Sequence, residues 1–284
     1  KQKTAYEIRL SLVGSEMCIR DRIIIGCGSL GSSVASLLAK AGVGTMALID
    51  PDNLSWDNVA RHENGGLAEI GRRKNQALAA DLSRRFPHLA IEGSAVSEWR
   101  QNYDAHPERW SAADLILTTT GSWASDSQLN VVHRHGGVIT CPVIYGFLEA
   151  HAAAGQAITV ETTGPCYQCG VNLVGYIHRA AFEWATSPLK QAPACGAFYQ
   201  PYGAADIAPT ARLIANAAVA RLLGGQPASP RAVWIGDTAQ AIRLGAALNS
   251  TSGVPEAEVR AGNRQLACDW PALSTCPACG SQPQ

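Results

Sequence analysis

The chain has 284 residues, of which 46% are hydrophobic and 16% are charged, a composition typical of a soluble α/β protein with one large core or two smaller ones. A formal net charge of zero and a pI near 7.2 exclude a strong electrostatic attraction to nucleic acid or to an anionic membrane. No apolar run is long enough to span a bilayer, and nine cysteines with two Cys-x-x-Cys pairs favour metal binding in a reducing, cytoplasmic compartment over disulfides.

Residues 1–22, KQKTAYEIRLSLVGSEMCIRDR, resemble a translated sequencing-adapter read-through. They contain no apolar stretch ending in a small-residue cleavage site, so they do not have the pattern of a secretory signal. We expect this segment to be an artefact, with the functional sequence beginning at Ile23 and its natural upstream residues missing.

Residues 23–52 have the pattern of a strand, a glycine turn, a helix and a second strand. Gly26, Gly28 and Gly31 in GCGSLG supply a tight turn, a close approach to phosphate and close helix packing. The helix N-terminus then offers free N–H groups to an anion. Asp50 ends the second strand, where an acid can accept hydrogen bonds from ribose hydroxyls. This unit predicts nucleotide binding rather than a merely structural βαβ unit, without indicating which nucleotide.

A polar loop leads from this unit into a helix predicted to begin near Gly71. Asn58 and Arg61 are three residues apart, which places them on one side of a helical turn. Lys74 follows on the predicted helix. An amide, a guanidinium and an ammonium group beside a glycine loop suit a bound triphosphate, because Arg61 can grip phosphate oxygens through two N–H groups and Lys74 adds a compact charge.

The series GCGSLG, IDPD, N-x-x-R and I-G-x-x-K over about 50 residues resembles the ThiF-type adenylyltransferases. This superfamily contains the ubiquitin-activating enzymes and the activators of molybdopterin and thiamine sulfur-carrier proteins. The resemblance implies ATP and Mg²⁺ as cofactors, with Asp52 among the nucleotide-site residues. A dehydrogenase shares the glycine loop but has no reason to keep the later residues.

The next strand, DLILTTTG, departs from the family pattern. In the family this strand ends in an Asp-containing motif whose acid helps to hold magnesium, followed by Asn, whereas this chain has Thr120, Gly121 and Ser122. Either magnesium is held by phosphates, water and another carboxylate such as Asp126 or Asp52, or this copy is catalytically weakened. The alternative interpretation of Asp126 is an acid on a helix surface.

Two Cys-x-x-Cys pairs, 106 residues apart, predict a structural zinc site. Four thiolates from two such knuckles give closed tetrahedral zinc with no open position for water. The metal would then fasten the C-terminal end to the middle of the chain, and the family commonly carries such a pair. The alternative is redox chemistry at one pair. The four expected ligands are Cys166, Cys169, Cys276 and Cys279.

Between these pairs, Cys195 precedes a predicted helix that begins at Asp206 and ends at Gly224. In the resembled family a comparable loop crosses the active site and often carries the cysteine that accepts the activated acyl group as a thioester. Cys195 is therefore a candidate acyl-accepting nucleophile, with a structural or incidental thiol as the alternative. Further along, residues 231–237 and 241–245 are expected to be strands.

Together these patterns predict an α/β fold, a Rossmann-like mixed sheet with helices on both faces, and a C-terminal segment stapled by zinc. We expect residues 23–165 to form the ATP-binding half and residues 166–284 to continue the same domain with a crossover loop and the zinc knuckles.

The resemblance implies an enzyme that adenylates the C-terminal glycine of a small ubiquitin-like protein, with Arg61, Lys74 and Cys195 as catalytic residues. It implies a homodimer and, in a bacterial ubiquitin-like conjugation system, a conjugating enzyme as a further partner. Activation of a sulfur-carrier protein of thiamine or molybdopterin synthesis is the alternative enzyme. A non-catalytic nucleotide-binding scaffold and an NAD-binding oxidoreductase are alternatives from other classes.

Overall fold

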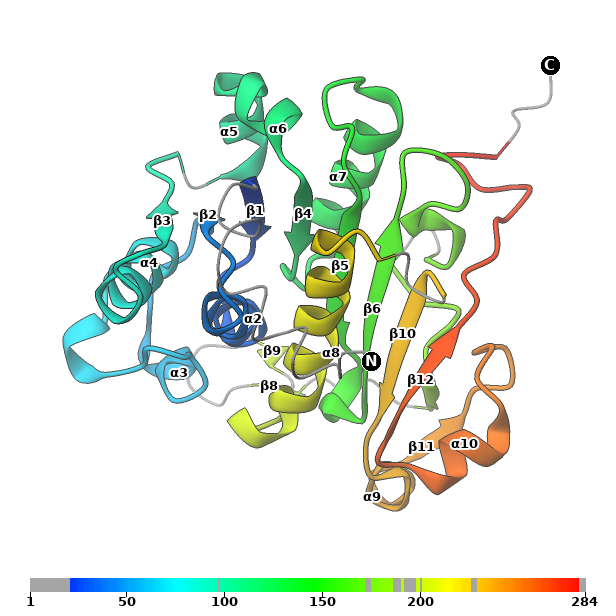
Figure 1. Cartoon of the computed structure of the whole chain (residues 1–284). Coiled ribbons are helices and arrows are strands. Elements are labelled where there is room, and N and C mark those ends of the chain that lie inside the picture. Colours follow the sequence, from blue (N-terminus) through cyan, green and yellow to red (C-terminus); the bar gives the residue numbers. More distant parts are fainter. Residues whose placement is uncertain are drawn as a thin grey trace, which may run out of the picture.

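The computed structural model describes residues 21–96, 98–171, 175–185, 190–191, 198–199, 201–225 and 229–280 (Figure 1). Its centre is an eight-stranded sheet in the order β12-β10-β6-β5-β4-β1-β2-β3. Strands β3, β2, β1, β4 and β5 run parallel, and β6, β10 and β12 each pair antiparallel with a neighbour. These strands are β1 (Asp21–Ile25), β2 (Thr45–Ile49), β3 (Ala90–Gly93), β4 (Leu115–Thr118), β5 (Val143–Leu148), β6 (Ala154–Val160), β10 (Arg231–Ile235) and β12 (Arg264–Cys268).

Helices cover both faces of this sheet, which confirms the predicted mixed α/β fold. They are α2 (Ser29–Lys40), α3 (Trp56–Val59), α4 (Lys74–Arg85), α5 (Trp99–Ala105), α6 (Pro107–Ala112), α7 (Trp123–His135), α8 (Ala204–Leu222), α9 (Thr238–Arg243) and α10 (Glu256–Ala261). The described residues also include the single 3₁₀ turns η1 (Leu67–Glu69), η2 (Ala150–Ala152) and η3 (Tyr167–Cys169). Within the described part of the chain, no helix combines the length and hydrophobicity needed to cross a bilayer.

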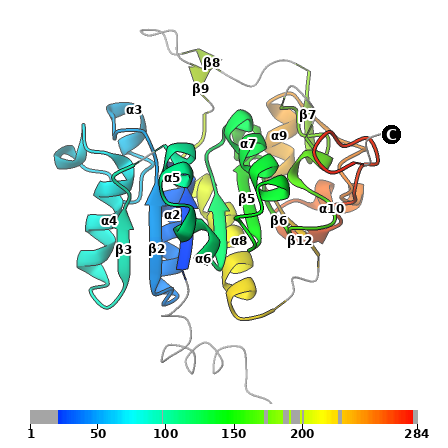
Figure 2. The ribbon, with the colours of Figure 1, turned by 90° about the horizontal axis from the view of Figure 1, so that it is seen from above.

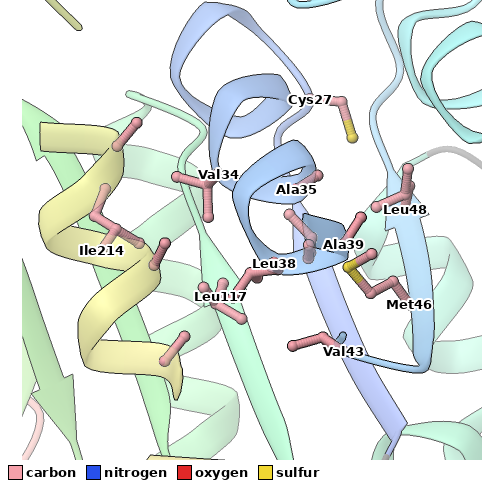
Figure 3. Close-up of a cluster of buried hydrophobic side chains, with 14 of the residues drawn as sticks. Cys27, Val34, Ala35, Leu38, Ala39, Val43, Met46, Leu48, Leu117 and Ile214 are labelled. Atoms are coloured by element: carbon pink, nitrogen blue, oxygen red, sulfur yellow. The ribbon is translucent and has the colours of Figure 1, made fainter. Parts of the chain in front are cut away.

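Alternation along the strands divides the core between the two faces. On one face, Ile24 of β1 belongs to a core cluster with residues of α2, α4 and α8, and Figure 3 shows Leu38 of α2 beside Leu117 and Val34 on the side of α2 that faces Ile214. On the other face, Ile23 belongs to a second core cluster, which includes residues of α5, α6 and α7 and extends to the four cysteine-pair residues. Helices α2, α4, α7 and α8 are therefore held by their buried apolar residues.

Two smaller strand pairs lie outside the main sheet. Strand β7 (Phe182–Trp184) pairs with β11 (Ala246–Leu248), and β8 (Lys190–Gln191) pairs with β9 (Phe198–Tyr199), which stands off the main body in Figure 2. The second half of the chain also adds β10 and β12 to the main sheet.

Two details differ from the sequence-based expectations. Residues 241–245 were expected to form a strand, but they belong mostly to α9, because the Asp237 side chain accepts the backbone N–H of Gln240 at 3.0 Å and caps this helix. Asp21 and Arg22 form the start of β1, in register with Thr45 and Met46. The first two residues of this strand thus lie within the segment expected to be an artefact.

Candidate functional site

The glycine loop joins the carboxyl end of β1 to the start of α2. Gly26 has a φ of +87°, and a Cβ there would lie 2.8 Å from the backbone of Thr119. A Cβ on Gly31 would lie 1.9 Å from the carbonyl oxygen of Gly26, so this glycine lets the helix pack against its own loop. A Cβ on Gly28 would meet open space, because its backbone borders a cavity.

This cavity has a volume of about 310 Å³ and lies at the carboxyl ends of β1, β2 and β4, where open α/β sheets bind ligands. The glycine loop, the start of α5 and the start of α7 all contribute residues to its lining. Its lining residues are Ile25, Gly26, Gly28, Asp50, Pro51, Asp52, Lys74, Glu98, Trp99, Thr119, Thr120, Ser122 and Ser125.

Asp50 fixes the glycine loop to the end of β2. Its Oδ2 accepts the backbone N–H of Cys27 at 2.6 Å, and its Oδ1 accepts that of Asp52 at 2.8 Å. Burial raises the pKa of Asp50, and these two hydrogen bonds oppose that shift. Each oxygen keeps a second lone pair, so the carboxylate can still accept a ligand hydroxyl.

His62 fixes the same loop from the other side, which sequence reasoning missed. Its Nε2 lies 2.7 Å from the carbonyl oxygen of Cys27, so Nε2 carries the proton and donates it. Its Nδ1 accepts the backbone N–H of Asn64 at 3.4 Å. Burial lowers the pKa of His62, which keeps the ring neutral. Cys27 thus has its N–H bound by Asp50 and its carbonyl bound by His62.

Lys74 and Asp52 form an ion pair in the cavity wall. The Nζ of Lys74 lies 2.7 Å from Oδ2 of Asp52, and the Lys74 backbone N–H donates to the Asp52 carbonyl at 2.9 Å. Lys74 is buried at the first residue of α4, whereas 65% of the Asp52 side chain is exposed. The pair therefore presents a cation at the base of the cavity and a carboxylate at its mouth.

Asn58 and Arg61 do not occur among the described lining residues of this cavity. The Asn58 side chain closes a capping box with Ser55, accepting its backbone N–H at 3.1 Å and donating to its hydroxyl at 2.8 Å. The guanidinium of Arg61 lies 4.9 Å from the ring centroid of Tyr202, at the start of α8. The sequence spacing of Asn58 and Arg61 predicted that they share one short helical turn, but it could not determine whether that turn faces the cavity.

Hydroxyl groups at and just after the end of β4 contact a buried acid in the first turn of α7. Oδ1 of Asp126 accepts hydrogen bonds from the hydroxyls of Thr118, at 2.6 Å, and Thr120, at 2.9 Å. Asp126 is 4% exposed, so its interpretation as a helix-surface acid is wrong. Burial raises its pKa to about 6, against the lowering effect of the two hydroxyls. Gly121 has a φ of +64° and open space where a side chain would point.

The four cysteines of the predicted metal site come together. Their sulfurs all lie within 4.8 Å of one another, with Cys166 to Cys276 at 3.6 Å and Cys169 to Cys279 at 3.3 Å. These separations are far longer than the 2.05 Å of a disulfide bond, and they are near the sulfur spacing of about 3.8 Å that Zn–S bonds of about 2.3 Å give in a tetrahedron. The arrangement can hold a metal ion, and its closed donor set suits structural zinc.

Cys195, the predicted nucleophile, lies outside the described residues. A described thiol beside the cavity is that of Cys27, which lies between the lining residues Gly26 and Gly28. Burial raises the pKa of Cys27, so this sulfur is a packing group of the core beneath the loop rather than a nucleophile (Figure 3).

A ThiF family model matches residues 20–231, which is well over half of the chain. Molybdopterin-synthase adenylyltransferase of Escherichia coli K12 is 31% identical over 155 residues, covering 54% of this chain and 59% of that enzyme. The ATP-dependent ubiquitin transferase-like protein Cap2 of Pseudomonas aeruginosa is 28% identical over 189 residues, covering 64% of this chain and 32% of Cap2.

A crystal structure of Escherichia coli MccB with ATP shares the fold, with a TM-score of 0.63 at 15% identity, covering 95% of this chain and 69% of that chain. This chain spans a little over half of the length of the molybdopterin enzyme, 59%. The family match covers the glycine loop, the Lys74 and Asp52 pair and the first cysteine pair. The chain belongs to the ThiF family.

Proposed function

We propose that the chain is an adenylyltransferase that uses ATP to activate the C-terminal carboxylate of a small ubiquitin-like or sulfur-carrier protein. The observation that carries this proposal is the cavity at the carboxyl edge of the sheet, where the glycine loop faces the Lys74 and Asp52 pair. The relatives named above as an adenylyltransferase and as a ubiquitin transferase-like protein support the same reaction class.

The chemistry needs electrostatic stabilisation more than proton transfer. A C-terminal carboxylate is already ionised near neutral pH, so it attacks the α-phosphorus of ATP without a general base. A new P–O bond forms to the carboxylate, and the bond to pyrophosphate breaks. Two anions must meet and a third must leave, so fixed positive groups lower the barrier. The glycine loop at the N-terminus of α2 and the ammonium of Lys74 are the groups that this cavity provides.

Magnesium belongs to this proposal, because a divalent cation bound with ATP would neutralise part of the phosphate charge. Mg²⁺ needs only one or two carboxylates and keeps several waters. Asp52 and Glu98 are the described lining residues that offer a carboxylate besides the doubly bonded Asp50. Asp126 does not line the cavity, and its Oδ1 already accepts two hydroxyl groups. We therefore favour Asp52 over Asp126 as the protein ligand.

The finer assignment within the family rests on the departure at β4 and on the sequence before α8. We propose that the substrate is a ubiquitin-like protein ending in glycine, in a bacterial conjugation system. In this proposal Cys195 accepts the acyl group from the adenylate as a thioester, releasing AMP. A homodimer and a conjugating enzyme are further partners that the resemblance implies. The alternative, a sulfur-carrier protein of thiamine or molybdopterin synthesis, needs no acyl transfer to Cys195. Asn58 and Arg61 stay predicted nucleotide contacts.

Exchange between ATP and pyrophosphate tests the adenylation step directly. Pure protein is incubated with labelled pyrophosphate, ATP, Mg²⁺ and a candidate carrier ending in glycine, and the matched control is the same carrier without its terminal glycine. We expect exchange that requires the glycine, is lost in Lys74→Ala and is retained in Cys195→Ala. Exchange that persists equally in Lys74→Ala contradicts the proposed site.

A nucleotide-binding scaffold is the second candidate, because Gly121 stands where the family has a metal-binding acid. Measurable ATP binding without exchange, across candidate carriers of both classes, would favour this function. The same assay thus separates the two candidates.

A further inference from the structure

Helix α7 connects the cavity to the four-cysteine site. Ser122, its N-cap, and Ser125, in its first turn, line the cavity. At its last residue, Nε2 of His135 lies 2.8 Å from the carbonyl oxygen of Ala278, inside the second cysteine pair. With a rise of about 1.5 Å per residue, this helix of 13 residues spans about 20 Å between the two places.

Asn130 is the central contact between this helix and the first cysteine pair. It is 0% exposed, and its Nδ2 lies 3.4 Å from the sulfur of Cys166 and 3.5 Å from Oε1 of Gln168. Its Oδ1 accepts the backbone N–H of Tyr167 at 3.0 Å. One buried side chain thus uses both ends of its amide on the loop that supplies two of the four sulfurs.

The same loop is bound to α7 at a second point, because the Gln168 amide donates to the hydroxyl of Ser127. Toward the cavity, the helix is held by the two threonine hydroxyls on Asp126 and by Trp99, whose Nε1 donates to Oγ of Ser125 at 2.9 Å. Polar contacts therefore hold α7 both to the cysteine loop and to the cavity wall, and the helix itself connects the two sets.

We propose that Asn130 is a positioning residue that couples metal binding at the four cysteines to nucleotide binding in the cavity. When the metal is bound, Cys166 is a thiolate, and the Asn130 N–H donates to its charge, which orients this ligand. The metal fixes the loop, the loop fixes α7 through Asn130, and α7 sets the position of the wall that carries Ser122 and Ser125. This inference rests on the proposed function only in taking ATP as the nucleotide.

Two consequences follow for the variant Asn130→Ala. The metal leaves faster, because loss of a partner behind a metal ligand commonly costs about 10- to 100-fold in metal affinity. Removal of the metal also affects ATP binding less in the variant than in the wild-type protein, because the connection is already broken. A residue with a purely structural role would give equal effects of metal removal in both proteins.

The test measures ATP affinity by calorimetric titration in four samples of the full chain: wild type and Asn130→Ala, each loaded with zinc and each stripped by a chelator. Metal release is followed with a chromophoric zinc indicator. Val131→Ala is the matched control, because this neighbouring side chain is exposed on the same helix. We expect metal removal to weaken ATP binding about tenfold in wild type and Val131→Ala and about twofold or less in Asn130→Ala.

Equal effects of metal removal in wild type and Asn130→Ala would overturn the coupling while leaving the proposed function intact. ATP that fails to bind zinc-loaded wild-type protein would overturn both proposals. If a stripped sample unfolds, hydrogen exchange of the zinc-loaded proteins replaces the titration. Asn130→Ala should then speed exchange of the α7 amides near Ser125, and unchanged exchange there would contradict the coupling.

Discussion

The ammonium group of Lys74 lies 2.7 Å from the carboxylate of Asp52, while the backbone N–H of the same lysine donates to the Asp52 carbonyl at 2.9 Å. Side chain and backbone together fix the start of α4 against the loop after β2. The cation of the cavity is therefore positioned before any ligand arrives.

Lys74→Ala should reduce the rate of ATP–pyrophosphate exchange by about 10²-fold, as expected when one preorganised donor to a developing charge is lost. Lys74→Arg should retain part of the rate, because it keeps the charge at a different geometry. Lys40→Ala is the control, since the Lys40 side chain is 54% exposed and its closest carboxylate, that of Glu63, is 3.9 Å away. A loss of similar size in Lys40→Ala would point to a general charge effect rather than to the site.

His62→Ala should weaken ATP binding although His62 does not line the cavity. The variant leaves the buried carbonyl of Cys27 without its donor, which costs about 1–3 kcal/mol. The glycine loop is then free to rearrange. ATP titration and denaturant unfolding check the two effects, with the exposed His88→Ala as control. Wild-type affinity together with a stability loss would show that the loop keeps its shape without this hydrogen bond.

Gly121→Asp should lower the Mg²⁺ concentration that gives half-maximal exchange. The new carboxylate would stand at the end of β4, where a side chain meets open space. The φ of +64° makes any side chain costly, so Gly121→Asn is the matched control with the same backbone cost and no charge. The exchange rate of both variants is measured as a function of Mg²⁺ concentration. A shift of equal size in the two variants would rule out metal binding by the new acid.

Asp126→Asn should flatten the pH dependence of stability. Burial raises the pKa of Asp126 from about 3.8 to about 6. Because the folded pKa is raised, its contribution to stability is fully present below about pH 4 and is lost as the pH rises through about 6. The shift corresponds to about 3 kcal/mol between these limits. Denaturant unfolding of both proteins from pH 4.5 to 7.5 measures the difference, in which the opposing titration of His133 cancels. Parallel curves would contradict the burial of an ionising carboxyl.

Cys276→Ser should abolish stoichiometric zinc binding and lower the unfolding temperature. A closed four-thiolate site loses one of its ligands, and binding energy that contributes to folding is lost with it. Atomic emission after purification gives the zinc content, with Cys268→Ser as control, because Cys268 is also buried but lies outside the cluster. Zinc retained at full occupancy in Cys276→Ser would show that the metal uses other ligands.

Local patterns predicted the parts of the fold and site that depend on neighbouring residues. The β-branched run before GCGSLG and the acid after the second strand placed both strands and the cavity edge correctly, since parallel strands bring their carboxyl ends together. The two Cys-x-x-Cys pairs predicted correctly that the four cysteines lie together, because two such pairs commonly supply the four ligands of one structural zinc ion.

Contacts between distant segments could not be read from these patterns. His62 meets Cys27 across 35 residues, and nothing in the sequence around either residue indicates the other. The sequence around Asp126 is that of an acid on a helix surface. Its carboxylate is nevertheless buried and accepts hydrogen bonds from the hydroxyls of Thr118, the last residue of β4, and Thr120. Arg61 lies over the ring of Tyr202 because the chain that enters α8 passes near the loop after α3, which only the tertiary fold determines.

The meeting of Cys166 with Cys276 joins residues 110 positions apart, with β10 and β12 built in between. Contacts of such separation form late, because the closure entropy of the intervening chain must first be offset by its own structure. A metal ion held by all four sulfurs would therefore link the middle of the chain to its C-terminal part across the antiparallel edge of the sheet. Loss of that ion would leave the thiols of both pairs without their shared ligand and open to oxidation.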